Sequence, residues 1–433
     1  MAESARQEAL EAEASIRRGD YRGPLHGVPI AIKDQIYTKG VLTTDASKIR
    51  SDFIPKYDAT VVSNLKTAGA ILLGKLNMSE FAHGEPQSSA FGPARNPWDL
   101  ARSPGVSSTG SGAATAARLC ATSLGEDTGG SIRGPAANCG LVGLRPTWGR
   151  VSRFGVDGAG WSFDTIGPVS RTVEDCAITM GGIAGYDPND PSTHQVPVPD
   201  YQAALTGDVK GIKVGIIQEL IDPVELELDP QMRQSVVTAI EVLSELGAEV
   251  KQVSMPLAEK SGYVTRAITH VDRVSLHPEY LRERGEDYHY NTRVHFTTAN
   301  LIPAQIYYKA QKLRSVIREQ VLTLLEDVDV LIQPTSGAPA NVINLDQNVV
   351  SQEHARKALA AGGFRGPYSR SGAPALSILC GFTTPTDGPN GNEGLPLAMQ
   401  IAGRPFEEAT VLRVAHAYEQ AAGWNSRIPP AAV

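Results

Sequence analysis

The sequence predicts an α/β protein, an α/β/α sandwich around a large, mixed and twisted β-sheet. Short, largely apolar segments recur along the chain, with the length and composition of strands that are buried on both faces. Several of them adjoin amphipathic segments of helical period, which is typical of crossover units. The 433 residues, 41% of them hydrophobic and 20% charged, can bury a large core. We therefore expect a single α/β domain over residues 1–433.

The first half of the chain is expected to hold the core of the domain, over residues 23–200. A charged helix precedes it at 2–18. The segment 57–75, DATVVSNLKTAGAILLGKL, reads as an amphipathic helix that runs into a short strand. Residues 100–150 are rich in Gly, Ser, Ala and Thr, but GSGAATAARLCATS has the alanine content of a tightly packed helix and LVGLRP reads as a strand.

In the second half, a strand is expected at 211–217, a helix at 229–247 and the next strand at 248–254. Apolar strands at 328–334, 375–382 and 395–403 complete the set, within a C-terminal sheet and helix region at 326–433. Between them, a variable helical region at about 255–325 is expected to cover one face as a substrate lid. Residues 336–350 and 384–394 read as loops.

Composition excludes several classes of protein. A net charge of -7 and a pI near 5.8, with scattered Lys and Arg, argue against a nucleic-acid partner. The chain shows no signal-peptide pattern and no apolar run that could span a bilayer, so we expect no membrane partner and a cytoplasmic location. Four widely spaced cysteines and nine histidines form no metal-ligand motif. Neither a metal nor another cofactor is expected.

Two Gly/Ser clusters carry the densest chemical signal: SPGVSSTGSGAATAA at 103–117 and SLGEDTGGSIRGPAANCG at 123–140. Such loops cradle phosphates, form tight turns or hold nucleophiles. The P-loop and dinucleotide patterns are both absent, and Ser131 lacks the G-x-S-x-G context of an α/β-hydrolase. Two glycines before Ser131 let several N–H groups point into one space, as an oxyanion site requires.

A nucleophilic serine also needs a base. His83 has no carboxylate near it in the sequence that would orient its ring. Lys33 ends the apolar segment GVPIAIKD, where burial would lower its pKa enough for it to act as the base. Taken alone, Lys33 also fits a surface lysine, and Ser107 and Ser131 fit turn or helix-cap serines. Their joint spacing favours a catalytic role.

These segments resemble the amidase signature family. The resemblance rests on GPLHGVPIAIKD at 23–34, LGKLNMSEFAHG at 73–84, the cluster at 104–112 and GEDTGGSIRGPAANCGLVGLRPTWGRVSR at 125–153. It extends to GYDPNDPST, VDVLIQPT and GLPLAMQIAG and so covers nearly the whole chain. It implies the amidase signature fold and hydrolysis of a carboxamide C–N bond without a cofactor.

The resemblance also implies residue roles. Lys33 is then the base, Ser107 the serine that follows a cis peptide bond, and Ser131 the nucleophile. The oxyanion hole consists of the amides at 128–131, namely Thr128, Gly129, Gly130 and Ser131. Ser108 and Asp127 are supporting hydrogen-bonding groups, and Arg133 is a structural ion-pair partner. At the first cluster the chain reads G-V-S-S-T-G, where the family usually reads G-G-S-S-G-G.

The substrate is less well defined. Candidate substrate-binding residues are Met78, Tyr288 in the aromatic lid, and Arg370, which is expected to meet an acidic substrate or to form a surface ion pair. The aromatic lid favours neutral aryl or alkyl amides. Alternatives are a carbamate (urethane) or urea-derivative hydrolase, the glutaminase subunit of a tRNA-dependent amidotransferase, and a non-catalytic binding protein. The expected partner is a small amide or carbamate, with a homodimer as a further possibility.

Overall fold

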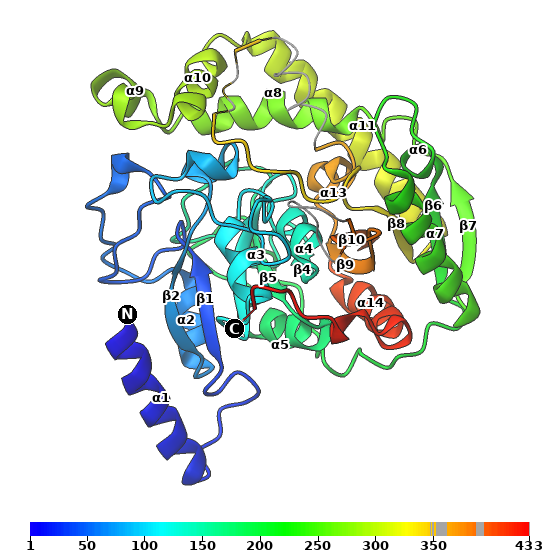
Figure 1. Ribbon diagram of the computed structural model, residues 1–433, viewed down its shortest axis with the longest axis horizontal. Coiled ribbons are helices and arrows are strands. Elements are labelled where there is room, and N and C mark those ends of the chain that lie inside the picture. Colours follow the sequence, from blue (N-terminus) through cyan, green and yellow to red (C-terminus); the bar gives the residue numbers. More distant parts are fainter. Residues whose placement is uncertain (347, 349, 352–361, 387–393, 433) are drawn as a thin grey trace.

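A ten-stranded mixed sheet runs through the centre of the molecule in the computed structural model, with helices on both faces (Figure 1). The structure describes residues 1–346, 348, 350–351, 362–386 and 394–432. The strand order is β2-β1-β3-β5-β4-β9-β10-β8-β6-β7. The strands are β1 (Pro29–Lys33), β2 (Ile71–Leu76), β3 (Thr122–Asp127), β4 (Val142–Arg145), β5 (Thr165–Ser170), β6 (Lys213–Ile217), β7 (Glu249–Val253), β8 (Val330–Pro334), β9 (Ala375–Phe382) and β10 (Pro396–Gly403). The α/β fold class expected from the sequence is confirmed.

The sheet is parallel at its two ends and antiparallel in its middle. β1 pairs in parallel with β2 and β3, and β6 pairs in parallel with β7 and β8. The pairings β3–β5, β5–β4, β4–β9, β9–β10 and β10–β8 are antiparallel. Because β1 and β3 run in the same direction side by side, their carboxyl ends, Lys33 and Asp127, lie at the same edge of the sheet.

Helices cover the sheet from both sides. They are α1 (Ala2–Arg17), α2 (Thr60–Thr67), α3 (Thr109–Ala116), α4 (Arg133–Cys139), α5 (Val173–Ile183), α6 (Gln218–Ile221), α7 (Pro230–Glu245), α8 (Ser261–Val274), α9 (Pro278–Glu283), α10 (Tyr290–Ala299), α11 (Ala304–Asp327), α13 (Gly366–Ser371) and α14 (Glu408–Ala422). One layer packs α2, α5, α7 and α14 together, and α3 and α4 contact the sheet as a pair. The helices α8 to α11 lie together along one side of the molecule, at the top of Figure 1. No helix in the described part of the chain is long and apolar enough to cross a bilayer.

Most predicted elements are confirmed with small shifts of their ends. The helix expected at 229–247 is α7, which is capped by the Asp229 carboxylate and followed by Gly247 with a φ of +98°. The segment 248–254 forms β7 as expected, but its side chains are largely exposed because it is an edge strand. Parts of the predicted loops 336–350 and 384–394 lie outside the described residues.

The strand β5 was not predicted, because its sequence TIGPVS contains both Gly and Pro. Its glycine is required by close packing, since a Cβ at Gly167 would stand 2.1 Å from the Leu144 carbonyl oxygen. The neighbouring strand β4 pairs with β5 only at Ser170 and Val169. Pro168 is therefore accommodated inside the sheet beyond the paired stretch of β4.

Candidate active site

Lys33 and Ser107 meet at the carboxyl edge of the parallel strands. Lys33 is the last residue of β1, its side chain is fully buried, and its Nζ lies 2.8 Å from Ser107 Oγ. Ser107 follows a cis peptide bond with Val106 and stands two residues before α3. Burial lowers the pKa of Lys33 from 10.5, against the opposing effect of the Glu126 carboxylate. The two side chains thus form a buried contact of the kind that a proton relay needs.

A third group contacts the lysine, and the sequence analysis missed it. Glu126 Oε2 lies 3.1 Å from Lys33 Nζ, and both side chains are fully buried. The Thr128 hydroxyl donates to Glu126 Oε1 at 2.7 Å. Ser108 Oγ donates to the Glu126 carbonyl and accepts from its amide, each at 3.3 Å, so Ser108 holds the glutamate backbone in place. The two adjacent acidic residues in G-E-D-T-G-G could have indicated a role for Glu126, but the sequence analysis assigned a role only to Asp127.

The nucleophile candidate Ser131 lies in the loop between β3 and α4. Gly130 has a φ of +122°, and a Cβ there would lie 2.3 Å from Arg365 Nε, so this position requires glycine. The Gly130 amide donates to Asp127 Oδ1 at 2.8 Å, which corrects the predicted oxyanion set, because this N–H group is already engaged. Among the described residues, the other three predicted amides, those of Thr128, Gly129 and Ser131, have no acceptor, so they are available to bind an oxyanion.

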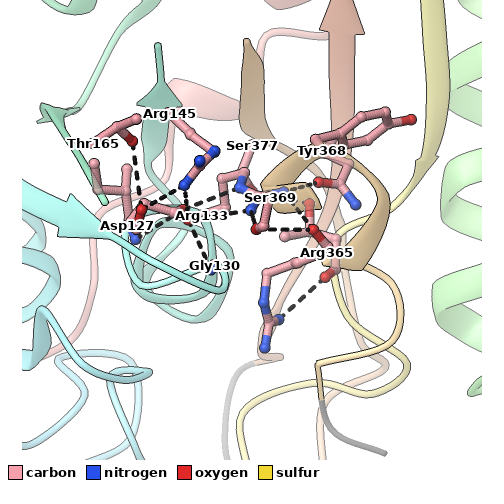
Figure 2. A network of polar contacts seen from close by, with 12 residues as sticks. Asp127, Gly130, Arg133, Arg145, Thr165, Arg365, Tyr368, Ser369 and Ser377 are labelled. Carbon is pink, nitrogen blue, oxygen red and sulfur yellow. Dashed lines mark hydrogen bonds and ion pairs between the residues drawn. The ribbon is translucent and has the colours of Figure 1, made fainter. Parts of the chain in front are cut away.

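Asp127 holds this loop in place through hydrogen bonds and ion pairs (Figure 2). Its carboxylate forms ion pairs with Arg133 at 3.1 Å and Arg145 at 2.9 Å, and all three side chains are fully buried. Burial alone would raise the pKa of Asp127, but the two guanidinium groups outweigh it and hold the pKa far below 3.8. Arg133 also donates to Ser369 Oγ at 2.7 Å, so it links the loop to α13. This placement is the structural ion pair expected for Arg133, with Arg145 as an additional partner.

A cavity of about 180 Å³ opens above these groups. Its floor consists of the loops that carry the candidate relay and nucleophile serines, with Ser107, Thr128, Gly129, Gly130 and Ser131. One wall is a single face of α8, with Gly262, Thr265, Arg266, Thr269, His270 and Arg273. These positions recur at intervals of three and four residues, which places them along one side of the helix. The predicted lid region therefore contributes to the site through α8.

The cavity is strongly cationic. Four arginines line it, Arg266, Arg273, Arg365 and Arg370, whereas Glu85 is the one carboxylate among the described lining residues. Burial lowers the pKa of Arg273 and of Arg365 to about 10, so both keep their charge at neutral pH. The described part of the wall thus carries an excess of positive charge.

Three histidines border the same space. His83 Nε2 and His295 Nδ1 lie 2.7 Å apart, and the His270 ring packs against both. Burial and the nearby arginines hold the pKa of His83 and of His270 well below 6.5, and lower that of His295 to about 4. All three rings are therefore neutral at neutral pH and act as hydrogen-bonding groups. The described residues contain no cluster of three or more His, Cys, Asp or Glu side chains that could hold a metal ion.

The predicted substrate-binding residues divide into two groups. Arg370 lines the cavity, which fits the predicted contact with an acidic substrate and not the predicted surface ion pair. Met78 does not, because it is fully buried among Ala46, Ala82 and Ala159. Tyr288 also points elsewhere: it packs with Phe81 and Phe296, and its hydroxyl lies 2.8 Å from His277 Nδ1. The prediction that Met78 and Tyr288 line the pocket was wrong, since apolar side chains there fill a small core of their own.

Glu80 links the segment before the cavity-lining Ala82 to His289, which precedes α10, and it should make the free energy of unfolding depend on pH. It accepts from Ser47 Oγ at 2.7 Å and from the His289 amide at 3.0 Å, and burial raises its pKa from 4.5 to about 7. A raised folded-state pKa favours the protonated protein, so this stabilisation is present below pH 4.5 and is lost as the pH rises through about 7.

In the wild type we expect Glu80 to lower the free energy of unfolding by on the order of 3 kcal/mol as the pH rises from 4.5 to 7. Glu80→Gln should not show this decrease. Urea unfolding at several pH values measures it. Glu319→Gln, an exposed change on α11, is the control and should keep the wild-type pH dependence. An unchanged slope in Glu80→Gln would contradict the prediction.

Comparisons with known proteins identify the family to which this fold belongs. The amidase family model matches residues 1–412. The A subunit of glutamyl-tRNA(Gln) amidotransferase from Geobacillus stearothermophilus is 41% identical, over 99% of this chain and 90% of the relative. The structure of the corresponding protein from Thermotoga maritima has a TM-score of 0.82 and 33% identity, over 100% of this chain and 96% of the other. A structure described as an unexpected vestigial protein complex, which reveals the origins of an s-triazine catabolic enzyme, has a TM-score of 0.85 and 34% identity, over 96% and 89% of the two chains.

Both the family match and these relatives extend over nearly the full chain, far beyond the two Gly/Ser clusters. The chain therefore belongs to the amidase signature family.

Proposed function

We propose that this chain hydrolyses the side-chain amide of a small carboxylate-bearing substrate, glutamine in the first place, and that it releases ammonia as one subunit of an amidotransferase-type assembly. The observation that carries this proposal is the charge of the cavity, where four arginines face one carboxylate among the described lining residues. Guanidinium groups bind carboxylates in a bidentate manner, so a wall with this excess of positive charge favours an anionic substrate. A neutral aryl or alkyl amide would bring no charge that complements this wall.

The relatives support the same proposal. The curated relative with 41% identity and the structural neighbour from Thermotoga maritima are both named as part of glutamyl-tRNA(Gln) amidotransferase. This chain spans 90% and 96% of their lengths. The alternative of a glutaminase subunit thus receives more support than the neutral-amide hydrolase that the sequence analysis favoured.

The proposed reaction uses the groups at the floor of the cavity. Ser131 Oγ attacks the amide carbon while its proton passes to Ser107 and the Ser107 proton passes to Lys33. The developing oxyanion accepts hydrogen bonds from the amides of Gly129 and Ser131. Collapse breaks the C–N bond, the leaving nitrogen takes a proton back along the relay, and ammonia departs. Water then hydrolyses the Ser131 acyl-enzyme.

A series of three primary amides tests the substrate class. L-Glutamine, glutaramate, which lacks the α-amino group, and butanamide, which lacks the carboxylate as well, isolate the contribution of the anion. We expect kcat/KM for glutaramate to exceed that for butanamide by about 10²-fold, the value of one or two charge-assisted hydrogen bonds. Equal or better turnover of butanamide or of an aryl amide would contradict the proposed substrate class.

Of the four arginines that line the cavity, Arg365 has a side chain that packs against Gly130 of the loop that carries Ser131. We expect Arg365→Gln to raise KM for glutamine by about 10-fold or more and to leave kcat/KM for butanamide unchanged within about 2-fold. Steady-state kinetics of ammonia release provide the measurement. The control is Arg282→Gln, an exposed change on α9. A parallel loss on both substrates would indicate damage to the loop instead of lost anion binding.

The role within a larger assembly is tested separately. Glutaminase activity that appears or rises strongly when the chain copurifies with other subunits would support it. Full activity of the isolated chain, with no copurifying partner, would contradict this role and leave the hydrolase assignment intact.

A second candidate is a hydrolase of a urea-type C–N bond, supported by the likeness to the complex related to an s-triazine catabolic enzyme. N-Carbamoylglycine presents a urea group and a carboxylate in one small molecule. Its turnover at a higher kcat/KM than glutamine would favour this candidate.

A further inference from the structure

The lysine of the relay shares its buried site with a carboxylate that the reaction described above does not use. Lys33 Nζ lies between Ser107 Oγ at 2.8 Å and Glu126 Oε2 at 3.1 Å. Neither the lysine nor the glutamate side chain has any exposed surface. Glu126 is held from three sides, by Lys33, by the Thr128 hydroxyl and by the two backbone bonds to Ser108. Its position is therefore well defined relative to the relay.

This geometry changes what can accept the serine proton. An ammonium group stabilised by a buried carboxylate has no lone pair, so it cannot act as a base by itself. It can, however, receive a proton from Ser107 if it gives one of its own to Glu126 at the same time. The second transfer runs over the 3.1 Å contact that the ion pair already forms.

We propose that Glu126 is the terminal proton acceptor of the relay, and that Lys33 passes to it the proton that arrives from Ser107. The Ser131 proton moves to Ser107, the Ser107 proton to Lys33 Nζ, and one Lys33 proton to Glu126 Oε2. The Ser131 Oγ–C bond forms, and the carbonyl π electrons move to the oxygen. When the C–N bond breaks, the same three protons return in reverse order and the leaving nitrogen is protonated. Charge stays balanced, because the carboxylate is neutralised as the oxyanion appears.

The charged groups that face Glu126 come from several elements of the fold. Asp164, which precedes β5, lies close enough to Glu126 for their carboxyl groups to repel each other when both are charged, and the Thr128 hydroxyl contacts both carboxyl groups. Burial, with the Glu126 charge as the next contribution, raises the pKa of Asp164 to about 7. The cations that act on Glu126 are Lys33, Arg145 from β4 and Arg273 from α8. Asp164 also lines a second cavity of about 240 Å³ beside the C-terminal end of α8, separate from the substrate cavity.

The test is the pH dependence of Ser131 labelling by a fluorophosphonate, located by peptide mass. This readout needs no amide substrate, although the inference itself rests on the proposed Ser131 mechanism. Glu126→Gln keeps the size of the side chain and an oxygen that can accept from Thr128. We expect its labelling rate at pH 8 to fall by about 10²-fold, the usual contribution of a general base, and its acid limb to move to higher pH. Glu126→Asp, which keeps a carboxylate, should recover part of the rate.

Each other outcome overturns the proposal in a recognisable way. An acid limb that moves to lower pH, with labelling as fast as wild type or faster, would make Glu126 a counter-ion that merely keeps Lys33 charged. A slower rate with an unmoved acid limb and no recovery in Glu126→Asp would make it a purely structural group.

The matched control is Glu408→Gln, which alters another fully buried glutamate whose partner, Arg150, lies outside the cavity lining. Its labelling profile should equal that of wild type. A wild-type protein that labels at Ser131 but does not hydrolyse glutamine would remove the proposed substrate and leave the role of Glu126 intact. A wild-type protein without label on Ser131 would overturn both.

Discussion

Replacement of Ser131 by alanine is expected to lower kcat for every substrate of this protein by at least about 10⁴-fold. The reason is that the proposed acyl-enzyme forms on the Ser131 oxygen, which alanine lacks. The Gly129 and Ser131 backbone amides remain, so substrate binding should change little. The measurement combines steady-state ammonia release with fluorophosphonate labelling, which should disappear from the peptide that contains residue 131.

Ser63→Ala is the control for this experiment, because Ser63 is an exposed serine on α2. It should retain both activity and label. Turnover in Ser131→Ala above about 1% of wild type would mean that another residue attacks the substrate, and a label on Ser107 would identify the alternative.

Asp127→Asn is expected to have the largest effect on stability, a loss of about 3–5 kcal/mol in the free energy of unfolding. The change removes the anion shared by Arg133 and Arg145 and leaves two guanidinium groups buried without it. It also places an amide donor opposite these donors. Equilibrium unfolding in urea at pH 7 measures the loss. Because the folded-state pKa of Asp127 is depressed, its stabilisation is complete above about pH 3.8 and is lost as the pH falls below that value toward the folded-state pKa.

A matched change in an exposed ion pair provides the control. Asp287 pairs with Arg284 at 2.8 Å, but both side chains are about 40% exposed. Asp287→Asn should therefore cost less than about 1 kcal/mol. A similar cost for the two variants would show that burial of the Asp127 network contributes nothing beyond an ordinary surface pair.

The parts of the fold that follow from local pattern were predictable. Apolar runs such as ALSILCGF and LPLAMQIAG became the buried strands β9 and β10, since strands covered on both faces carry almost no polar side chains. The placement of Lys33 at the end of β1 also followed, because a charged residue that closes an apolar strand lies at the edge of the sheet.

The cavity wall could not be predicted in the same way. Arg266, His270 and Arg273 stand four and three residues apart on α8, and a polar stripe with this spacing usually faces solvent. Only tertiary packing turns the stripe inward. Glu126 was missed for a related reason. Its partner Lys33 lies on a neighbouring strand, 93 residues away in the sequence, so no local pattern links the two side chains.

The division of the site between the sheet edge and α8 has an evolutionary consequence. The proposed reacting groups are carried by the ends of β1 and β3 and by the loops beyond them, and these two strands pair in parallel. Six of the cavity residues are carried by a single helix in another segment of the chain. Substitutions along this face of α8, apart from Arg273, can change which molecules the cavity accepts without contacting the proposed reacting groups on the strands. Substrate range can therefore change in evolution through a few substitutions on α8. A mutant library confined to the cavity-lining positions of α8 would explore the same changes in the laboratory.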